Sequence, residues 1–172
     1  MVYSPTWISE STQIGWTAPG NVDDSMLVPG GTVATFRDAV LGGGEFIYLL
    51  GAANTILGSV VTYVVSTGVS LSGVTTLWAG TASTGAPVAV ATAAIVAAKW
   101  GWYQIGGAAI VATSGTVTAG NPLYFQTTGV VQAAAVNGKQ IVGAVAGSAN
   151  GVPTTNQTIV TLDRPMVQAQ IV

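Results

Sequence analysis

Few side chains of this 172-residue chain could do chemistry, and the densest group of them is acidic. The segment Asn21-Val22-Asp23-Asp24-Ser25 supplies carboxylate and amide oxygens, which are the ligands that calcium prefers. A complete calcium-binding loop also needs a closing acidic residue, which this segment lacks. A solvated acidic turn is therefore the preferred interpretation, and we predict no metal ion and no cofactor.

A second candidate is the run Gly42-Gly43-Gly44, which precedes an apolar stretch. Glycine-rich loops cradle phosphate groups when a lysine and a serine or threonine follow and a helix begins there. Here those residues are missing, and the next stretch has the composition of a strand. We interpret the three glycines as a flexible hinge.

The densest aromatic group is formed by Trp100, Trp102 and Tyr103, next to Lys99. On a strand, Trp100 and Trp102 share one face. Such a pair could stack on a sugar or a base, but an all-β core and a subunit interface use the same residues. We favour a role in the core or in an interface.

The sequence contains few residues of the types that catalyse reactions. There is no histidine and no cysteine, and a serine nucleophile needs a general base. Between Phe46 and Leu162 the only charged side chains are Lys99 and Lys139. The pair Asp163-Arg164 is more typical of a local ion pair than of a catalytic pair. We predict no catalytic residue and expect the protein not to be an enzyme.

The net charge of the chain also bears on which classes of partner it could bind. The formal net charge is −2, and the four basic residues are scattered along the chain, so nothing in the sequence favours nucleic acid. Charged residues make up 6% of the chain, against roughly a quarter in typical soluble domains. Either something other than charge keeps the protein in solution, or much of its surface is buried in an assembly.

The window from Phe46 to Val65 is uncharged and apolar enough to resemble a membrane span. Gly51, Asn54, Gly58 and Ser59 divide it into two short runs rich in β-branched or aromatic residues. That pattern is typical of two strands joined by a loop, so we predict no membrane contact.

Short runs of this kind, separated by turn residues, continue to the end of the chain and predict an all-β fold, a small β-sandwich or a β-barrel-like domain. Asn137-Gly138 is the strongest hairpin signal. For Ala86–Ala98 we favour the start of a strand, with a helical turn near Ala93–Ala98 as the alternative. The predicted strands are 45–50, 59–65, 75–78, 87–92, 101–113, 115–118, 122–126, 129–136, 140–146 and 157–162.

Residues 1–44 differ from the rest, because prolines are spaced along them and the periodicity is poor. We predict an extended N-terminal arm and hinge over 1–44 and a β-rich domain over 45–172. Aromatic side chains in a segment without its own core pack on the domain or on a neighbouring subunit. The residues that we expect at an interface, with a neighbouring subunit or with another protein of an assembly, are Trp7, Trp16, Phe36, Trp100, Trp102 and Tyr103.

Several stretches of the sequence resemble those of tailed-bacteriophage structural proteins. One stretch runs from Pro29–Val33 through Gly42–Gly51, and a second is Gly101–Ala109. Both resemble stretches of structural proteins that are encoded with the capsid genes. Others are similar to the small β-domain of phage head decoration proteins, also called capsid cement proteins: Thr116–Leu123, Gly129–Val131 and Gln140–Val145. Gln13–Pro19, in the proposed arm, also resembles this group.

The resemblance implies a β-rich and often trimeric virion protein on the outer surface of an icosahedral capsid. Its partners would be the major capsid protein and further copies of itself, and it would clamp capsomers together. The resembling motifs contain no reactive residue. The alternative is a head fibre or host-attachment module that binds surface glycans through Trp100, Trp102 and Tyr103.

Overall fold

The computed structural model of the protein describes residues 8–9, 16–65, 73–77, 81–127 and 129–170. These ranges contain strands and turns but no helix, so the predicted all-β class is confirmed. The strands are β1 (Ile8–Ser9), β2 (Val33–Asp38), β3 (Gly42–Leu50), β4 (Val60–Val65), β5 (Gly73–Leu77), β6 (Val88–Ala91), β7 (Trp100–Ala112), β8 (Pro122–Thr127), β9 (Val130–Gln132), β10 (Gln140–Ala146) and β11 (Gln157–Val167).

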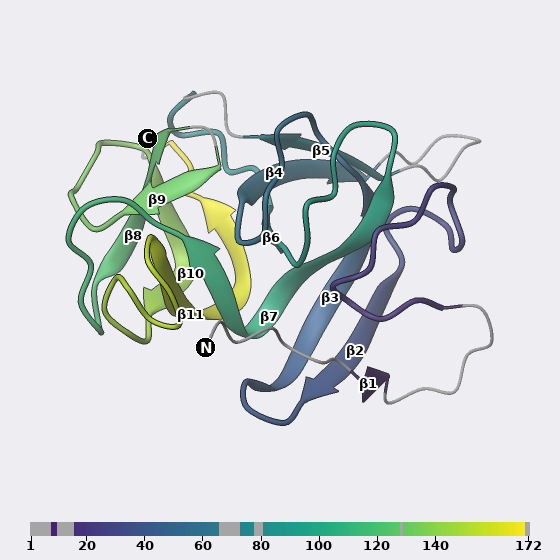
Figure 1. The fold of residues 1–172 in the computed structure, drawn as a ribbon. Helices are drawn as coiled ribbons and strands as arrows, with labels where there is room; N and C mark the ends of the chain where they lie inside the picture. The colour runs from purple at the N-terminus through teal and green to yellow at the C-terminus, as the bar shows by residue number, and fades with distance from the viewer. Residues whose placement is uncertain (1–7, 10–15, 66–72, 78–80, 128, 171–172) are drawn as a thin grey trace.

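The strands form one 11-stranded sheet in the order β1-β2-β3-β5-β4-β6-β7-β11-β10-β8-β9 (Figure 1). All pairings are antiparallel except β3 with β5, which share the single pair Leu50 and Val74. The sheet as a whole is not closed, and its two ends are β1 and β9. An additional pairing of β3 with β7 folds it back on itself, so that β3, β5, β4, β6 and β7 follow one another in a ring of pairings.

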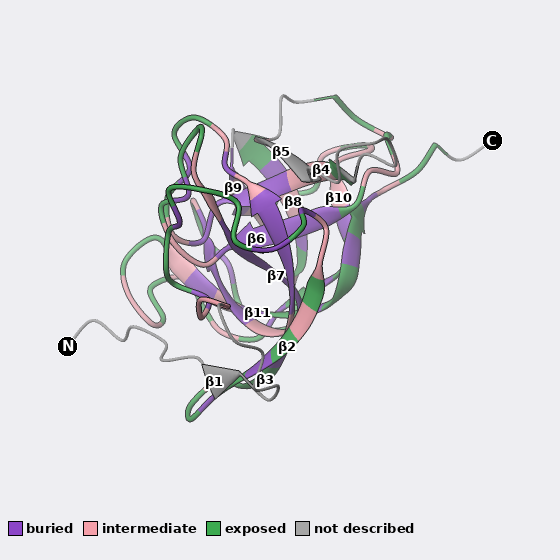
Figure 2. Ribbon diagram, turned by 90° about the vertical axis from the view of Figure 1, so that its right-hand side faces the viewer, coloured by how far each residue is buried: buried purple, intermediate pink, exposed green. Residues whose placement is uncertain are grey.

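Strand β7 is the centre of this arrangement. It pairs with β3 and β6 over its first half and with β11 over its second half. A strand covered on both faces needs a nearly continuous apolar sequence, and β7 (WGWYQIGGAAIVA) has one. Figure 2 shows buried residues along β6 and β7. Alternate side chains enter different clusters: Trp102 packs with Phe36 and Tyr48, and Tyr103 packs on the other side.

The predicted division at residues 44 and 45 falls inside β3. Strand β2 pairs with β3 from Val33 and Ile47 to Asp38 and Gly42, and Phe36 is buried in the core. Residues 16–44 therefore contribute to the same sheet and core and are not an extended arm. The interpretation of Gly42–Gly44 as a hinge is wrong for the same reason, because these residues are paired in β3.

Three local expectations need correction. Asn137-Gly138 forms a turn closed by a hydrogen bond from the Lys139 N–H to the Val136 carbonyl, but the strands on either side do not pair, because β8 lies between β9 and β10. Only the glycine has positive φ, at 71°, whereas a type I′ hairpin turn needs two such residues. Residues 115–118 form no strand, and 93–98 form no helical turn.

The apolar window 46–65 consists of most of β3, a loop and β4. Within the described ranges no helix is long and apolar enough to cross a membrane.

Candidate functional site

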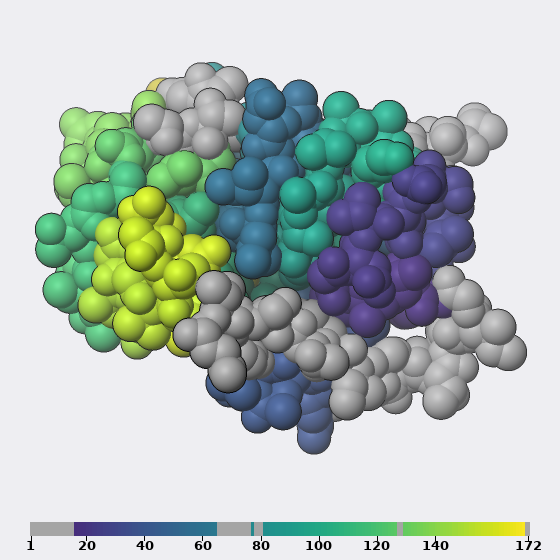
Figure 3. Space-filling model, in the orientation of Figure 1, coloured from purple at the N-terminus to yellow at the C-terminus, as the bar shows by residue number. Residues whose placement is uncertain are grey.

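A segment of irregular chain, residues 16–28, crosses β3 and β7, and we call it the strap. The Trp16 ring lies 5.4 Å from that of Trp102, whose indole N–H donates to the Thr17 carbonyl at 2.7 Å. Further along, Asp23 and Trp100 exchange two backbone hydrogen bonds of 2.9 Å each. In Figure 3 the strap, in purple, lies beside the teal loop before β7. These contacts fix the strap on the sheet.

Beneath the strap lies an aromatic cluster centred on Trp102. The rings of Phe36 and Tyr48 meet that of Trp102 edge to face, with centroids 5.1 and 5.2 Å away. Phe46 meets Phe36 at 84° and 5.4 Å. Aromatic pairs of this geometry stabilise a fold by about 0.5–1.5 kcal/mol each beyond the burial of their surface. The cluster therefore holds the strap, β2, β3 and β7 together.

The acidic segment is part of this packing. Asp23 is 7% exposed, and its Oδ2 accepts hydrogen bonds from the Tyr48 hydroxyl at 2.7 Å and the Thr17 hydroxyl at 2.8 Å. Buried carboxylates need such partners. The expectation of a solvated turn therefore holds only for its neighbour Asp24, which pairs with Lys99 on the surface. The described residues contain no group of three acidic side chains that could hold a metal ion.

Tyr48 makes stability depend on alkaline pH. Burial raises the pKa of its phenol above the ordinary value of 10, and the hydrogen bond to Asp23 raises it further. Above about pH 10 this phenol is ionised in the unfolded chain but still protonated in the folded chain, so the unfolded state binds fewer protons. The contribution of Tyr48 to the free energy of unfolding is therefore full at lower pH and falls as the pH rises. We expect Tyr48→Phe to show a shallower fall in unfolding free energy between about pH 9 and pH 11, measured with denaturant.

The slope that remains in Tyr48→Phe would come in part from Tyr63, whose pKa burial also raises. Tyr63→Phe is the comparison, and it should leave the contribution of Tyr48 to the slope in place. At neutral pH, Tyr48→Phe should cost about 1–3 kcal/mol, because Asp23 loses a donor in a buried position. Equal slopes in the wild type and in Tyr48→Phe would contradict the assignment.

The sequence matches no known protein-family model and no curated protein. The assignment of a site therefore depends on where the predicted residues lie.

The structure brings several of the predicted interface residues together, but mostly in the interior. Phe36, Trp102 and Tyr103 are at most 1% exposed. They are core residues of this chain, so Trp102 and Tyr103 cannot form a stacking platform for a glycan. Trp16 and Trp100 are half-buried, and Trp100 stacks on Tyr48 at 5.8 Å and 13°. Trp7 lies outside the described residues.

The surface of the strap carries apolar side chains that the sequence interpretation missed. Val22, Met26 and Leu27 are 40%, 47% and 49% exposed. Val96, in the loop that precedes Lys99 and is joined to it by a turn hydrogen bond, is 40% exposed. Each residue is ordinary in the sequence, and only the fold of the strap places them outside. They form the candidate interface, which we call the strap surface.

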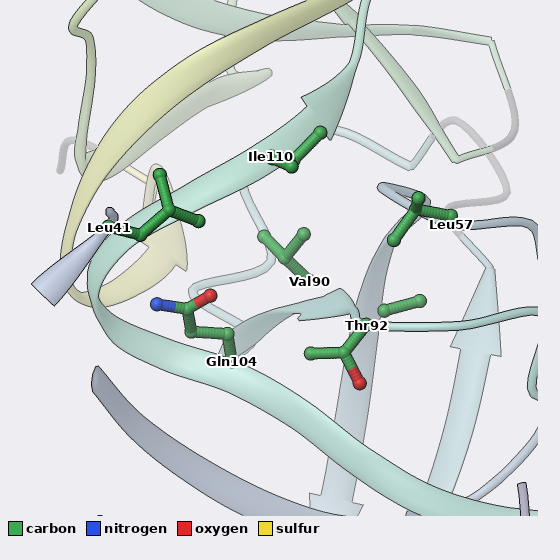
Figure 4. A pocket seen from close by; sticks show the side chains of 7 residues that line it. Leu41, Leu57, Val90, Thr92, Gln104 and Ile110 are labelled. Carbon is green, nitrogen blue, oxygen red and sulfur yellow. The ribbon is translucent and has the colours of Figure 1, made fainter. Parts of the chain in front are cut away.

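An exposed ion pair and a small cavity are two further features, and neither forms a candidate site. Arg164 pairs with Glu45 across the sheet and not with Asp163 as predicted, and an exposed pair of this kind contributes little to stability. Figure 4 shows a cavity between Leu41, Leu57, Val90 and Ile110. Its volume of about 20 Å³ has room for about one water molecule.

Proposed function

We propose that this protein is a non-enzymatic structural protein of a phage virion. It binds the outer surface of the icosahedral capsid as a homo-oligomer, a trimer by its resemblance to head decoration proteins, and it stabilises the contacts between capsomers. The resemblance of its sequence motifs to those proteins supports this proposal, and so does the apolar strap surface.

The strap surface is the observation that carries the proposal. Met26 and Leu27 lie next to one another and are half-exposed, although the strap itself is fixed by hydrogen bonds and ring contacts. A segment whose backbone is already ordered loses less conformational entropy on binding than a flexible one. Obligate interfaces resemble a core cut in half, and the two charged side chains beside these apolar residues, Asp24 and Lys99, are paired with one another.

The protein would act by mass action. A ligand that binds only the assembled, expanded shell shifts the equilibrium away from disruption in proportion to its concentration and affinity. Oligomerisation would add avidity, because each copy that has bound raises the effective concentration of the next strap surface.

The strap surface can be tested by introducing a charge. We expect Met26→Asp to weaken binding to expanded phage heads that lack this protein by at least about tenfold, because a carboxylate would be buried without a partner. Binding is measured by cosedimentation, and the gain in head melting temperature by calorimetry. Light scattering gives the oligomer in solution.

Val40→Asp is the matched control. Val40 is 70% exposed in the turn between β2 and β3 and is not part of the strap surface, so its substitution should leave head binding unchanged. A wild-type protein that is monomeric and does not bind the heads would refute the capsid role. Heads bound equally by both variants would refute the role of the strap surface.

A further inference from the structure

A row of polar side chains crosses four neighbouring chain segments on one face of the sheet. Tyr124 in β8 lies opposite Gln132 in β9 and opposite Gln140 in β10. Gln168, which follows β11, donates its backbone N–H to the Gln140 carbonyl at 2.8 Å. Directly opposed residues project to the same face of a sheet, so these side chains form a continuous row.

The opposite face of the same strands belongs to the core. The neighbours of the row residues are Val131, Phe125, Ile141 and Val167, which are 0–2% exposed and pack in one apolar cluster. The row residues are themselves half-buried. The alternation expected of a sheet with one solvated face therefore directs an aromatic ring and several amides outward.

Loops convert part of this row into a groove. The Ser83 N–H donates to the Gly138 carbonyl at 2.7 Å, which holds the loop before β6 against the turn before β10. The groove has a volume of about 380 Å³, within the range of roughly 300–1,000 Å³ typical of small-molecule sites. Its lining residues come from β8, from the turn before β10 and the start of β10, from the segment after β11 and from Ser83; β8 and β10 lie at one end of the molecule (Figure 1). Its polar side chains belong to Ser83, Tyr124, Asn137, Gln140, Gln168 and Gln170.

The chemistry of the groove is neutral. Of the described residues that line it, none is charged. Within the part of the chain that the structure describes, neither the Tyr124 hydroxyl nor the side-chain amides of Asn137, Gln140, Gln168 and Gln170 make a hydrogen bond. Each amide offers two donor hydrogens and an acceptor oxygen, which suits vicinal hydroxyl groups, and the tyrosine ring offers an apolar face for stacking.

We propose that this groove binds a neutral oligosaccharide. The ligand's hydroxyl groups pair with the side-chain amides, and one sugar ring packs on Tyr124. The site is separate from the aromatic residues buried under the strap, and the proposal does not depend on the capsid role.

The test uses the full chain and an array of neutral malto-, cello-, chito-, galacto- and manno-oligosaccharides, with sialylated and sulfated oligosaccharides beside them. The best neutral binder is then titrated by calorimetry. We expect Tyr124→Ala and Gln140→Ala to weaken its binding by at least about tenfold. Tyr124→Phe, which keeps the ring, should lose less than Tyr124→Ala.

Gln126→Ala is the matched control, because Gln126 is an exposed glutamine on the same strand that does not line the groove. It should bind as the wild type does, and so should Trp100→Ala. Melting curves establish that each variant is folded. The proposal is overturned if no neutral oligosaccharide binds, if only acidic oligosaccharides or peptides bind, or if folded Tyr124→Ala and Gln140→Ala both bind as tightly as the wild type.

Discussion

Trp102→Ala is expected to lower the free energy of unfolding by about 3–5 kcal/mol, the usual cost of removing a fully buried large aromatic side chain. The Trp102 ring touches those of Trp16, Phe36 and Tyr48, and its N–H donates to the strap at Thr17. The substitution therefore leaves a cavity and an unpaired carbonyl under the strap. Because domains are stable by only about 5–15 kcal/mol, the substitution should remove a large share of the stability of the protein.

Chemical denaturation monitored by circular dichroism measures this effect. Trp100→Ala is the comparison, since Trp100 is half-buried and, among the described residues, its ring stacks on that of Tyr48 only. We expect it to cost clearly less than Trp102→Ala. If the two substitutions cost the same, the cluster around Trp102 would not be what joins the strap to the sheet.

The second large effect is expected at Gly107, where β7 passes from β3 to β11. Its φ is +86°, and an added Cβ would lie 2.3 Å from the Gly43 carbonyl oxygen. A left-handed conformation costs a residue with a side chain roughly 1–2 kcal/mol, and overpacking costs about 1–3 kcal/mol more. Gly107→Ala should therefore destabilise the protein by about 2–5 kcal/mol.

Gly115→Ala separates the two contributions. Gly115 has φ +68°, but an added Cβ there would meet nothing within 4 Å. It should cost only the conformational part, about 1–2 kcal/mol. If the dependence of the unfolding free energy on denaturant is the same for both variants, their denaturation midpoints give the difference in stability between them. A Gly107→Ala protein as stable as Gly115→Ala would show that β3 can move away from β7 without loss.

Local sequence patterns predicted the strands well where one pattern ran without interruption. Strand β10 was predicted with its observed bounds, and β7 within one residue at each end. Strand β2 was missed because Pro29 and scattered acidic residues interrupt the local pattern of a strand. This short strand is stabilised by its pairing with β3, which the local sequence does not reveal. The Asn137-Gly138 turn was predicted as a hairpin because turn chemistry does not reveal that β8 lies between the flanking strands.

The candidate sites depended more on tertiary structure than the strands did. Sequence grouped Trp100, Trp102 and Tyr103 by proximity, but the pleat sends Trp102 and Tyr103 into two different clusters. The row of Tyr124 with Gln132 and Gln140 has no local signature, because its members lie on three strands and only the register aligns them.

The position of β7 has a consequence for the order in which the chain can fold during synthesis. Its first half pairs with β3, which is made about 60 residues earlier, and its second half waits for β11, which begins at Gln157. Until the ribosome has released residues 157–167, one edge of the second half of β7 lacks the strand with which it pairs in the folded protein. Such an edge recruits other strands, so a chaperone that holds the nascent chain should engage it in this interval and leave it once β11 emerges.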